Sequence, residues 1–126
     1  MNLNQVTVPS HDLEIAIPFY EKLGLNLIVK ALPHYARFEC PDGESTFSLH
    51  QVDQINPNND IWVYFEVDQL DQKVAELINL GIQFDEMPED KSWLWREARL
   101  KDPDGNQLIL YYAGENRKNP PWRVMG

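Results

Sequence analysis

Two stretches of the chain, residues 12–25 (DLEIAIPFYEKLGL) and 69–82 (QLDQKVAELINLGI), decide the fold because they are versions of one pattern. A Leu-Gly pair ends each pattern, at residues 23–24 and 80–81, and an aliphatic residue follows it. Each stretch predicts a helix that ends at its glycine, since glycine readily adopts the left-handed conformation that follows many helices. The recurrence at a constant offset predicts two copies of one structural module.

Alternating strands precede both helices, and matching turns follow them. In the second half, Val63, Phe65 and Val67 recur at every other position, which is typical of a strand with one buried face. Pro-Asp-Gly occurs at residues 41–43 and again at 103–105, and favours a tight turn between strands. Each module is therefore predicted to be βαβββ. The predicted strands are 3–9, 25–31, 34–40, 45–52, 61–67, 82–87, 93–100 and 106–112, and the predicted helices are 12–23 and 69–80.

Length and composition indicate one globular domain. The chain has 126 residues, of which 43% are hydrophobic and 25% are charged, values that are ordinary for a folded protein of this size. We expect a single domain over residues 1–126, with modules at 3–53 and 60–113. Residues 114–126 are expected to form a polar tail on the surface.

The charge of the chain restricts its partners. A formal net charge of −9 disfavours nucleic acid and anionic membrane surfaces, which repel an acidic protein. No apolar run approaches the roughly 20 residues of a membrane helix, and the first residues lack the features of a signal peptide. Cys40 is the only cysteine, so no internal disulfide can form. These features predict a cytoplasmic protein.

Six short motifs follow one another in a characteristic order: Asn4–Pro9, Asp12-Leu13, Phe19-Tyr20, Leu23–Leu25, Phe65–Asp68 and Asp102–Asn106. Together they resemble the vicinal-oxygen-chelate superfamily of glyoxalases, bleomycin-resistance proteins and dioxygenases. The resemblance covers about residues 3–112, and residues 93–106 also resemble the bleomycin-resistance branch. It implies an α+β fold in which two βαβββ modules form an open barrel-like cavity.

The resemblance also implies four cavity positions that hold a divalent metal in metal-dependent relatives. In this chain they fall on Gln5, Ser48, Trp62 and Ile109. An amide oxygen is a weak ligand, whereas indole and aliphatic side chains offer no lone pair to a metal. His50 shares a strand face with Ser48, but one histidine beside a glutamine is not a credible metal site. We therefore expect a member of the superfamily without a metal or other cofactor.

Strand alternation predicts which side chains line the cavity, because Trp62, Tyr64 and Glu66 point away from the face that meets the helix. Aromatic rings beside a carboxylate favour an aromatic or cationic ligand. The same rings could instead fill the barrel or a dimer interface. The predicted ligand-binding residues are Gln5, Thr7, Arg37, Ser48, His50, Trp62, Tyr64, Glu66, Trp95, Ile109 and Tyr111.

The sequence leaves three functions open. The first is a metal-free protein that binds a small molecule, because the fold motifs are retained and the ligating residues are not. The second is a lyase, isomerase or dioxygenase of the same superfamily, for which His50, Tyr64 and Glu66 are general acid–base types. The third is a regulatory or interaction module. The resemblance further implies a homodimer, since the cavity in this family is commonly completed by a two-fold partner.

Overall fold

The computed structural model describes residues 1–124, which divide into two compact units. The first unit comprises Met1–Asp60 together with Asp102–Asn106. The second comprises Ile61–Lys101 and the chain from Gln107 onward. The second Pro-Asp-Gly turn therefore belongs to the first unit, although it lies within the second half of the sequence.

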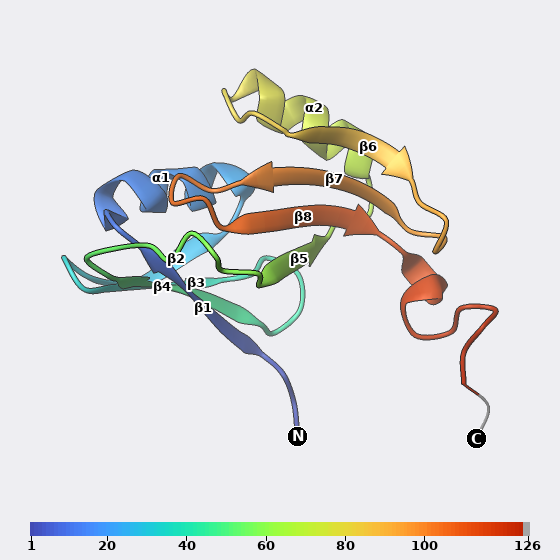
Figure 1. Cartoon of the computed structure of the whole chain (residues 1–126), viewed down its shortest axis with the longest axis horizontal. Coiled ribbons are helices and arrows are strands. Elements are labelled where there is room, and N and C mark those ends of the chain that lie inside the picture. The colour runs from blue at the N-terminus through green and yellow to red at the C-terminus, as the bar shows by residue number, and fades with distance from the viewer. Residues whose placement is uncertain (125–126) are drawn as a thin grey trace. The chain divides into compact units, whose positions relative to one another are not determined.

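The first unit is a four-stranded sheet with one helix (Figure 1). Strand β1 pairs in parallel with β4, whereas β3 pairs antiparallel with both β4 and β2. Helix α1 begins after Asp12, whose side chain accepts a hydrogen bond from the backbone N of Glu14, and ends at Gly24 with φ of 107°. The elements are β1 (Gln5–Ser10), α1 (Leu13–Leu23), β2 (Asn26–Ala31), β3 (Tyr35–Glu39) and β4 (Thr46–Gln51).

Helix α1 buries one face against strands β2, β3 and β4. Tyr20 is at the centre of this core, and its ring centroid lies 4.7 Å from that of Phe47 and 5.8 Å from that of Phe38. All three residues are almost fully buried. The period of the helix places Leu13, Ile17 and Tyr20 on the buried side, and hydrophobic burial of this side stabilises the unit.

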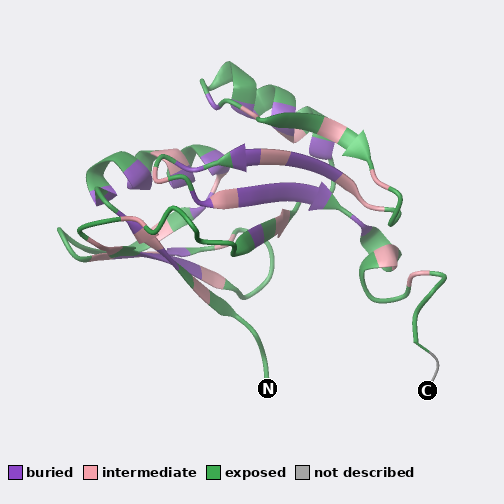
Figure 2. Cartoon of the chain, viewed as in Figure 1, coloured by how far each residue is buried: buried purple, intermediate pink, exposed green. Residues whose placement is uncertain are grey.

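The second unit repeats this architecture, with the strand order β5-β8-β7-β6 in place of β1-β4-β3-β2. Helix α2 contacts β6, β7 and β8 through Leu70, Val74 and Leu77. Figure 2 shows buried residues along β7, β8 and the inner side of each helix. The elements are β5 (Trp62–Glu66), α2 (Leu70–Asn79), β6 (Glu86–Asp90), β7 (Arg96–Lys101), β8 (Gln107–Tyr112) and a short 3-10 helix, η1 (Gly114–Arg117).

The predicted α+β class with two βαβββ modules is confirmed. The two sheets are separate, and neither closes into a barrel. The single domain over 1–126, with modules at 3–53 and 60–113, stays a prediction. Residues 125–126 of the predicted tail lie outside the described residues. Neither helix within residues 1–124 is long and apolar enough to cross a membrane.

The boundaries of β6 and β7 are wrong in the sequence prediction. Strand β6 spans Glu86–Asp90 instead of 82–87, and β7 begins at Arg96 instead of 93. The turn between them is closed by hydrogen bonds from Lys91 N to Trp95 O and from Leu94 N to Lys91 O. Leu94 adopts φ of 66°, a conformation that leucine seldom takes. The sequence did not predict this turn, because no glycine or proline stands where the chain reverses.

Candidate functional site

The sheet face of the first unit that lies opposite α1 is polar. Strand register places Thr7 beside Ser48, and Ser48 beside Arg37, in one row across β1, β4 and β3. Tyr35 and His50 form the next row of the same face. We call this surface the polar face; its members are Gln5, Thr7, Tyr35, Arg37, Thr46, Ser48 and His50.

A hydrogen-bond network joins the polar face through Ser48, which is fully buried. Gln5 Nε2 donates to Ser48 Oγ at 2.6 Å, and the hydroxyl of Tyr35 lies 2.6 Å from the same oxygen. Arg37 Nε donates to the Tyr35 hydroxyl at 2.9 Å. Gln5 Nε2 also donates to Thr7 Oγ1, so the structure brings together four residues of the predicted set and adds Tyr35; the four are Gln5, Thr7, Arg37 and Ser48. His50 is exposed and lies opposite Tyr35 in the strand pairing.

The charge of Arg37 affects Tyr35. Burial opposes ionisation of the Tyr35 hydroxyl, but its hydrogen bonds with Ser48 and Arg37, and the nearby positive charge, lower its pKa overall. The guanidinium carbon of Arg37 also lies 5.4 Å from the centre of the tyrosine ring. Arg37 therefore places a positive charge on the polar face, which also carries Glu39 beside Thr46.

The corresponding face of the second unit is aromatic. Strand register places Tyr64, Ile109 and Arg99 in one row, and Glu66, Tyr111 and Glu97 in the next. Trp95 stacks on Tyr111 at 4.7 Å between ring centroids. We call this surface the aromatic face; its members are Trp62, Tyr64, Trp95, Glu97, Arg99, Ile109 and Tyr111.

The edge of the Tyr64 ring meets both stacked rings, at 5.9 Å from Trp95 and 5.4 Å from Tyr111. Tyr64 and Trp62 are 39% and 51% exposed, so their rings remain accessible. Trp95 is oriented by a hydrogen bond from its Nε1 to the backbone oxygen of Asn116. The aromatic face therefore presents accessible rings that are supported by fixed ones.

Glu97 is a buried carboxylate in this face, with only 1% of its side chain exposed. Trp93 Nε1 donates to its Oε2 at 2.7 Å, whereas Oε1 accepts no hydrogen bond and has Arg99 Nη2 at 3.7 Å. Arg99 also lies 4.8 Å above the Trp62 ring and 3.2 Å from Glu86. A buried carboxylate with one unsatisfied oxygen is costly unless another group compensates it.

Burial and the charge of Glu97 raise the pKa of Tyr64, and Arg99 offsets part of this increase. Burial and the charge of Glu66 likewise raise the pKa of Tyr111. Both tyrosines therefore remain neutral hydrogen-bonding groups at neutral pH.

Glu66 has a structural partner that the sequence did not reveal. Its Oε2 accepts hydrogen bonds from the backbone N of Ala113 at 2.9 Å and of Gly114 at 3.0 Å. Arg117 lies 3.8 Å from its Oε1. Glu66 thus caps the start of η1 and lies beside Tyr111 in the strand pairing, whereas Glu97 is the buried carboxylate of this face.

The four positions that hold metal in metal-dependent relatives do not suit a metal ion here. The Gln5 carbonyl oxygen accepts a hydrogen bond from the Thr46 hydroxyl, and the Ser48 oxygen is engaged twice. Trp62 has no lone pair to offer, and Ile109 is fully buried and aliphatic. Within residues 1–124, no group of three or more His, Cys, Asp or Glu side chains is arranged to hold a metal.

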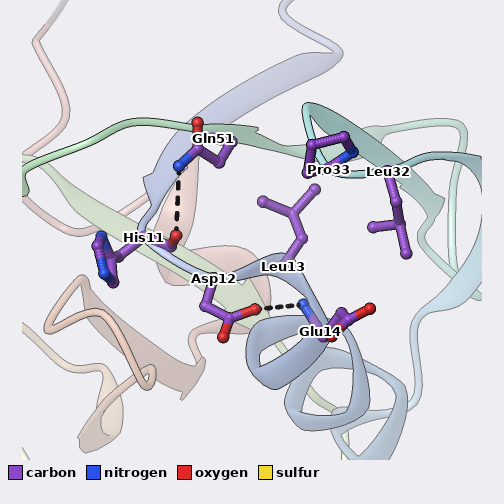
Figure 3. Close-up of a pocket in the computed structure, with 7 residues that line it drawn as sticks. All are labelled: His11, Asp12, Leu13, Glu14, Leu32, Pro33 and Gln51. Carbon is purple, nitrogen blue, oxygen red and sulfur yellow. Dashed lines mark hydrogen bonds between the residues drawn. The ribbon is translucent and has the colours of Figure 1, made fainter.

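Two surface pockets lie away from the predicted residues. One, of about 250 Å³, lies beside the first turn of α1 and is lined by His11, Asp12, Leu13, Glu14, Leu32, Pro33 and Gln51 (Figure 3). In it, Asp12 caps the helix and Gln51 Nε2 donates to the backbone oxygen of His11. The other is an apolar groove between α2 and β6. Neither contains any residue predicted to bind ligand.

Sequence reasoning missed Tyr35, Glu97 and Arg99 as members of the site. Alternation along β3 places Tyr35 on the same face as Arg37, so that signal was available. Glu97 and Arg99 alternate in the same way on β7. Their burial and ion pairing depend on Trp93 and Glu86, whose positions follow from the unpredicted turn at Leu94.

Comparison with known proteins gives a family match over most of the chain. A family described as "Glyoxalase/Bleomycin resistance protein/Dioxygenase superfamily" matches residues 2–110. A "Probable trivalent organoarsenical cleaving enzyme" of Bacillus subtilis (strain 168) is 29% identical over 115 residues, covering 82% of this chain and 75% of that protein.

Solved structures show the same fold. The bleomycin resistance determinant encoded on the transposon Tn5 superposes with a TM-score of 0.76 at 22% identity, covering 89% of this chain and 98% of that one. A lactoylglutathione lyase from Agrobacterium tumefaciens gives a TM-score of 0.74 at 18% identity, with coverage of 98% and 97%. A bleomycin-binding protein complexed with bleomycin gives a TM-score of 0.73 at 22% identity, covering 89% of this chain and 98% of that one. At these identities the likeness concerns the fold.

Proposed function

This chain belongs to the glyoxalase/bleomycin resistance protein/dioxygenase superfamily, and from that premise we propose that it is a metal-free protein that binds a small molecule. The ligand is an aromatic or cationic compound that docks on the aromatic face. The observation that carries this proposal is the combination of accessible Trp62 and Tyr64 rings with the buried carboxylate of Glu97.

The chemistry of the aromatic face supports such a ligand. A planar ligand gains favourable contact from rings that already have fixed orientations, because little side-chain entropy is lost on binding. A cation is attracted by the ring faces and by negative charge nearby. Arg99 neutralises part of the Glu97 charge, so the aromatic contribution is expected to exceed the ionic one.

The relatives are consistent with binding as a function. One structural neighbour is a bleomycin-binding protein complexed with bleomycin, so this fold can serve to bind a ligand. The metal positions of this chain carry poor ligands or none, which favours binding over metal-dependent lyase or dioxygenase chemistry. The ligand residues in this proposal are Trp62, Tyr64, Trp95, Ile109 and Tyr111.

Isothermal titration calorimetry with benzyltrimethylammonium and with bleomycin tests the proposal. The first probe combines an aromatic ring with a permanent cation. Substitution Trp62→Ala should raise the dissociation constant about 3- to 30-fold, the loss expected for one cation–π contact. Titrations with benzyl alcohol and tetramethylammonium separate the aromatic part of the signal from the ionic part.

Trp122→Ala is the matched control, because Trp122 is 58% exposed, close to the 51% of Trp62, and lies outside the aromatic face. It should bind both probes as the unmodified protein does. If Trp62→Ala binds a probe with unchanged affinity, the assignment of Trp62 is wrong. If neither probe binds at millimolar concentration, an aromatic or cationic ligand is the wrong class.

We also propose that the protein is a homodimer, as the family resemblance implies, and that it is cytoplasmic, as its single cysteine indicates. Light scattering at micromolar concentration should give twice the monomer mass of 14.7 kDa. A monomer under these conditions would refute the dimer without affecting the ligand proposal.

A further inference from the structure

We propose that the polar face of the first unit binds an oxyanion, the carboxylate or phosphate group of a small molecule, through the guanidinium of Arg37. This inference goes beyond the proposed function, because it concerns the other unit and a ligand group of opposite charge. It does not require the aromatic face to bind anything.

Arg37 is half-buried and has no acidic partner. No carboxylate within residues 1–124 lies within 4.0 Å of its guanidinium nitrogens, whereas Arg96 and Arg99 are each paired with two. Among the described residues 1–124, Arg37 makes one hydrogen bond, through Nε, so the four N–H groups of Nη1 and Nη2 are available there. These groups form the fork that matches a carboxylate or phosphate in bidentate geometry.

Neighbouring side chains hold Arg37 in place. Its Nε donates to the Tyr35 hydroxyl, and its guanidinium carbon lies 5.4 Å from the Tyr35 ring centre. The Tyr35 hydroxyl is in turn 2.6 Å from buried Ser48 Oγ. A guanidinium fixed in this way loses less conformational entropy on binding than a free surface arginine does.

Several side chains of the polar face carry more hydrogen-bond donors than their neighbours accept. The carbonyl oxygen of Gln5 accepts from Thr46, which directs the amide nitrogen of Gln5 to Ser48 and to Thr7. Tyr35 and Ser48 carry two hydroxyl protons but share only one hydrogen bond with each other, so one proton is left to donate.

The hydroxyl of Thr7 adds to this surplus, since it accepts from Gln5 and keeps its own proton. Beside Arg37, the network therefore offers donors and few free acceptors. An oxyanion is the group that satisfies such a set, because it accepts several hydrogen bonds and donates none.

The charge environment agrees with this assignment. The lowered pKa of Tyr35 indicates that negative charge at its oxygen is stabilised. Glu39 is the acidic residue that shares this sheet face; it lies beside Thr46 in the β3–β4 pairing and accepts a hydrogen bond from Asn26. The net charge of −9 opposes anions at long range, so anion binding here depends on the local contacts of Arg37 rather than on general attraction.

Nuclear magnetic resonance of the ¹⁵N-labelled full chain tests the site. Sodium benzoate and sodium phosphate are titrated separately against sodium chloride at constant ionic strength. We expect saturable shifts of the Arg37 Nε–H and Ser48 amide signals with at least one of the two anions and none with chloride. Saturation by benzoate alone identifies a carboxylate site, and saturation by phosphate alone identifies a phosphate site.

Arg37→Met should weaken the affinity at least about tenfold, as expected for the loss of a bidentate charged contact. Lys30→Met is the matched control: it removes the same charge from the same sheet, at an exposed residue that pairs with Ala36 on the helix-covered side. Lys30→Met should retain the affinity of the unmodified protein.

Shifts that do not saturate with either anion, or that persist unchanged in Arg37→Met, overturn the proposal. Because binding is read at Arg37 and Ser48, failure here leaves the titrations with aromatic cations on the second unit unaffected. Tyr35→Phe provides a second test, since it keeps the charge but removes the hydroxyl that orients Arg37. Tyr35→Phe should lower the affinity for the anion less than Arg37→Met does.

Discussion

The hydroxyl of Tyr20 donates a hydrogen bond of 2.5 Å to Oδ2 of Asp102, which lies 82 residues further along the chain. Asp102 also accepts hydrogen bonds from the backbone N of Asp104 and Asn106, and from Asn106 Nδ2. Asn106 Nδ2 in turn donates to the backbone oxygen of Pro9. This network attaches the turn Asp102–Asn106 to the core of the first unit, which explains why the turn belongs to that unit.

Removal of the Tyr20 hydroxyl should destabilise the protein. In Tyr20→Phe, Asp102 loses one partner while it remains mostly buried, and a hydrogen bond to a charged group contributes about 1.5–3 kcal/mol. Urea unfolding followed by circular dichroism measures this change. Tyr112→Phe is the control, because Tyr112 is 44% exposed and should change stability by less than about 0.5 kcal/mol. Equal unfolding free energies for the two variants would contradict a structural role for the Tyr20–Asp102 bond.

Asp102 should titrate at a higher pH than an ordinary aspartate. Burial raises its pKa, and the hydrogen bonds from Tyr20 and Asn106 offset only part of that increase. The folded state therefore binds this proton more tightly than the unfolded state, so the Asp102 contribution to stability falls as the pH rises from about 3.9 through the folded-state pKa. Carbon-13 titration of the Asp102 carboxyl reports the midpoint directly. A midpoint at or below the ordinary aspartate value of about 3.9 would show that its hydrogen bonds outweigh its burial.

Truncation to alanine should lower the unfolding free energy strongly at Leu77 and only slightly at Ile78. Leu77 is fully buried under the sheet, so Leu77→Ala removes apolar contacts and leaves a cavity, at a cost of about 2–5 kcal/mol. Ile78 follows it on the same helix but is 42% exposed, so Ile78→Ala should cost less than about 1 kcal/mol. Thermal and urea unfolding of the two variants give the comparison. Similar losses at both positions would mean that α2 is packed through a different face.

The ion pair between Asp71 and Arg96 should make a small, pH-dependent contribution. Arg96 donates to both carboxylate oxygens of Asp71, at 2.8 and 2.9 Å, and these hydrogen bonds lower the pKa of Asp71. A lowered pKa in the folded state means that the stabilisation is present above the unfolded pKa of about 3.9 and is lost as the pH falls through the folded value. The pair is exposed, so salt should weaken it.

Asp71→Asn therefore should reduce stability slightly at pH 7 and have no effect at low pH, as measured by urea unfolding across the pH range. Asp68→Asn is the control, because it makes the same charge change at an exposed residue just before α2. If Asp71→Asn and Asp68→Asn behave alike at every pH, the bidentate pair contributes nothing.

Local sequence patterns were sufficient to predict the modules. The apolar period of α1 and α2, the glycines at 24 and 81 and the strand alternation all depend on neighbours a few residues away, and each appears in the structure. The turn at Leu94 was not predictable in this way, because a leucine with positive φ is held there by the surrounding hairpin rather than by its own preference.

In the candidate site, Trp62, Tyr64 and Ile109 lie in strands that the sequence predicted. The sequence did not predict which groups form hydrogen bonds or ion pairs with the charged residues. Glu66 stays a predicted ligand-binding residue, and the structure adds that it caps η1 through two backbone N–H groups. Glu97, which was not predicted as a site residue, is a second carboxylate near the aromatic rings. Hydrogen bonds between residues far apart in the sequence leave no local signal that periodicity could detect.

The sequence by itself determined the repeated βαβββ modules, because helix and strand periods and glycine and proline turns are short-range properties. With the family resemblance, it also predicted poor metal ligands at the positions that the resemblance implies, because ligand chemistry depends on residue type. Only the tertiary structure decided that Asp102 and its turn are anchored to Tyr20, and that no carboxylate of residues 1–124 pairs with Arg37. Those relationships depend on strand register and packing, which bring together groups that no local pattern connects.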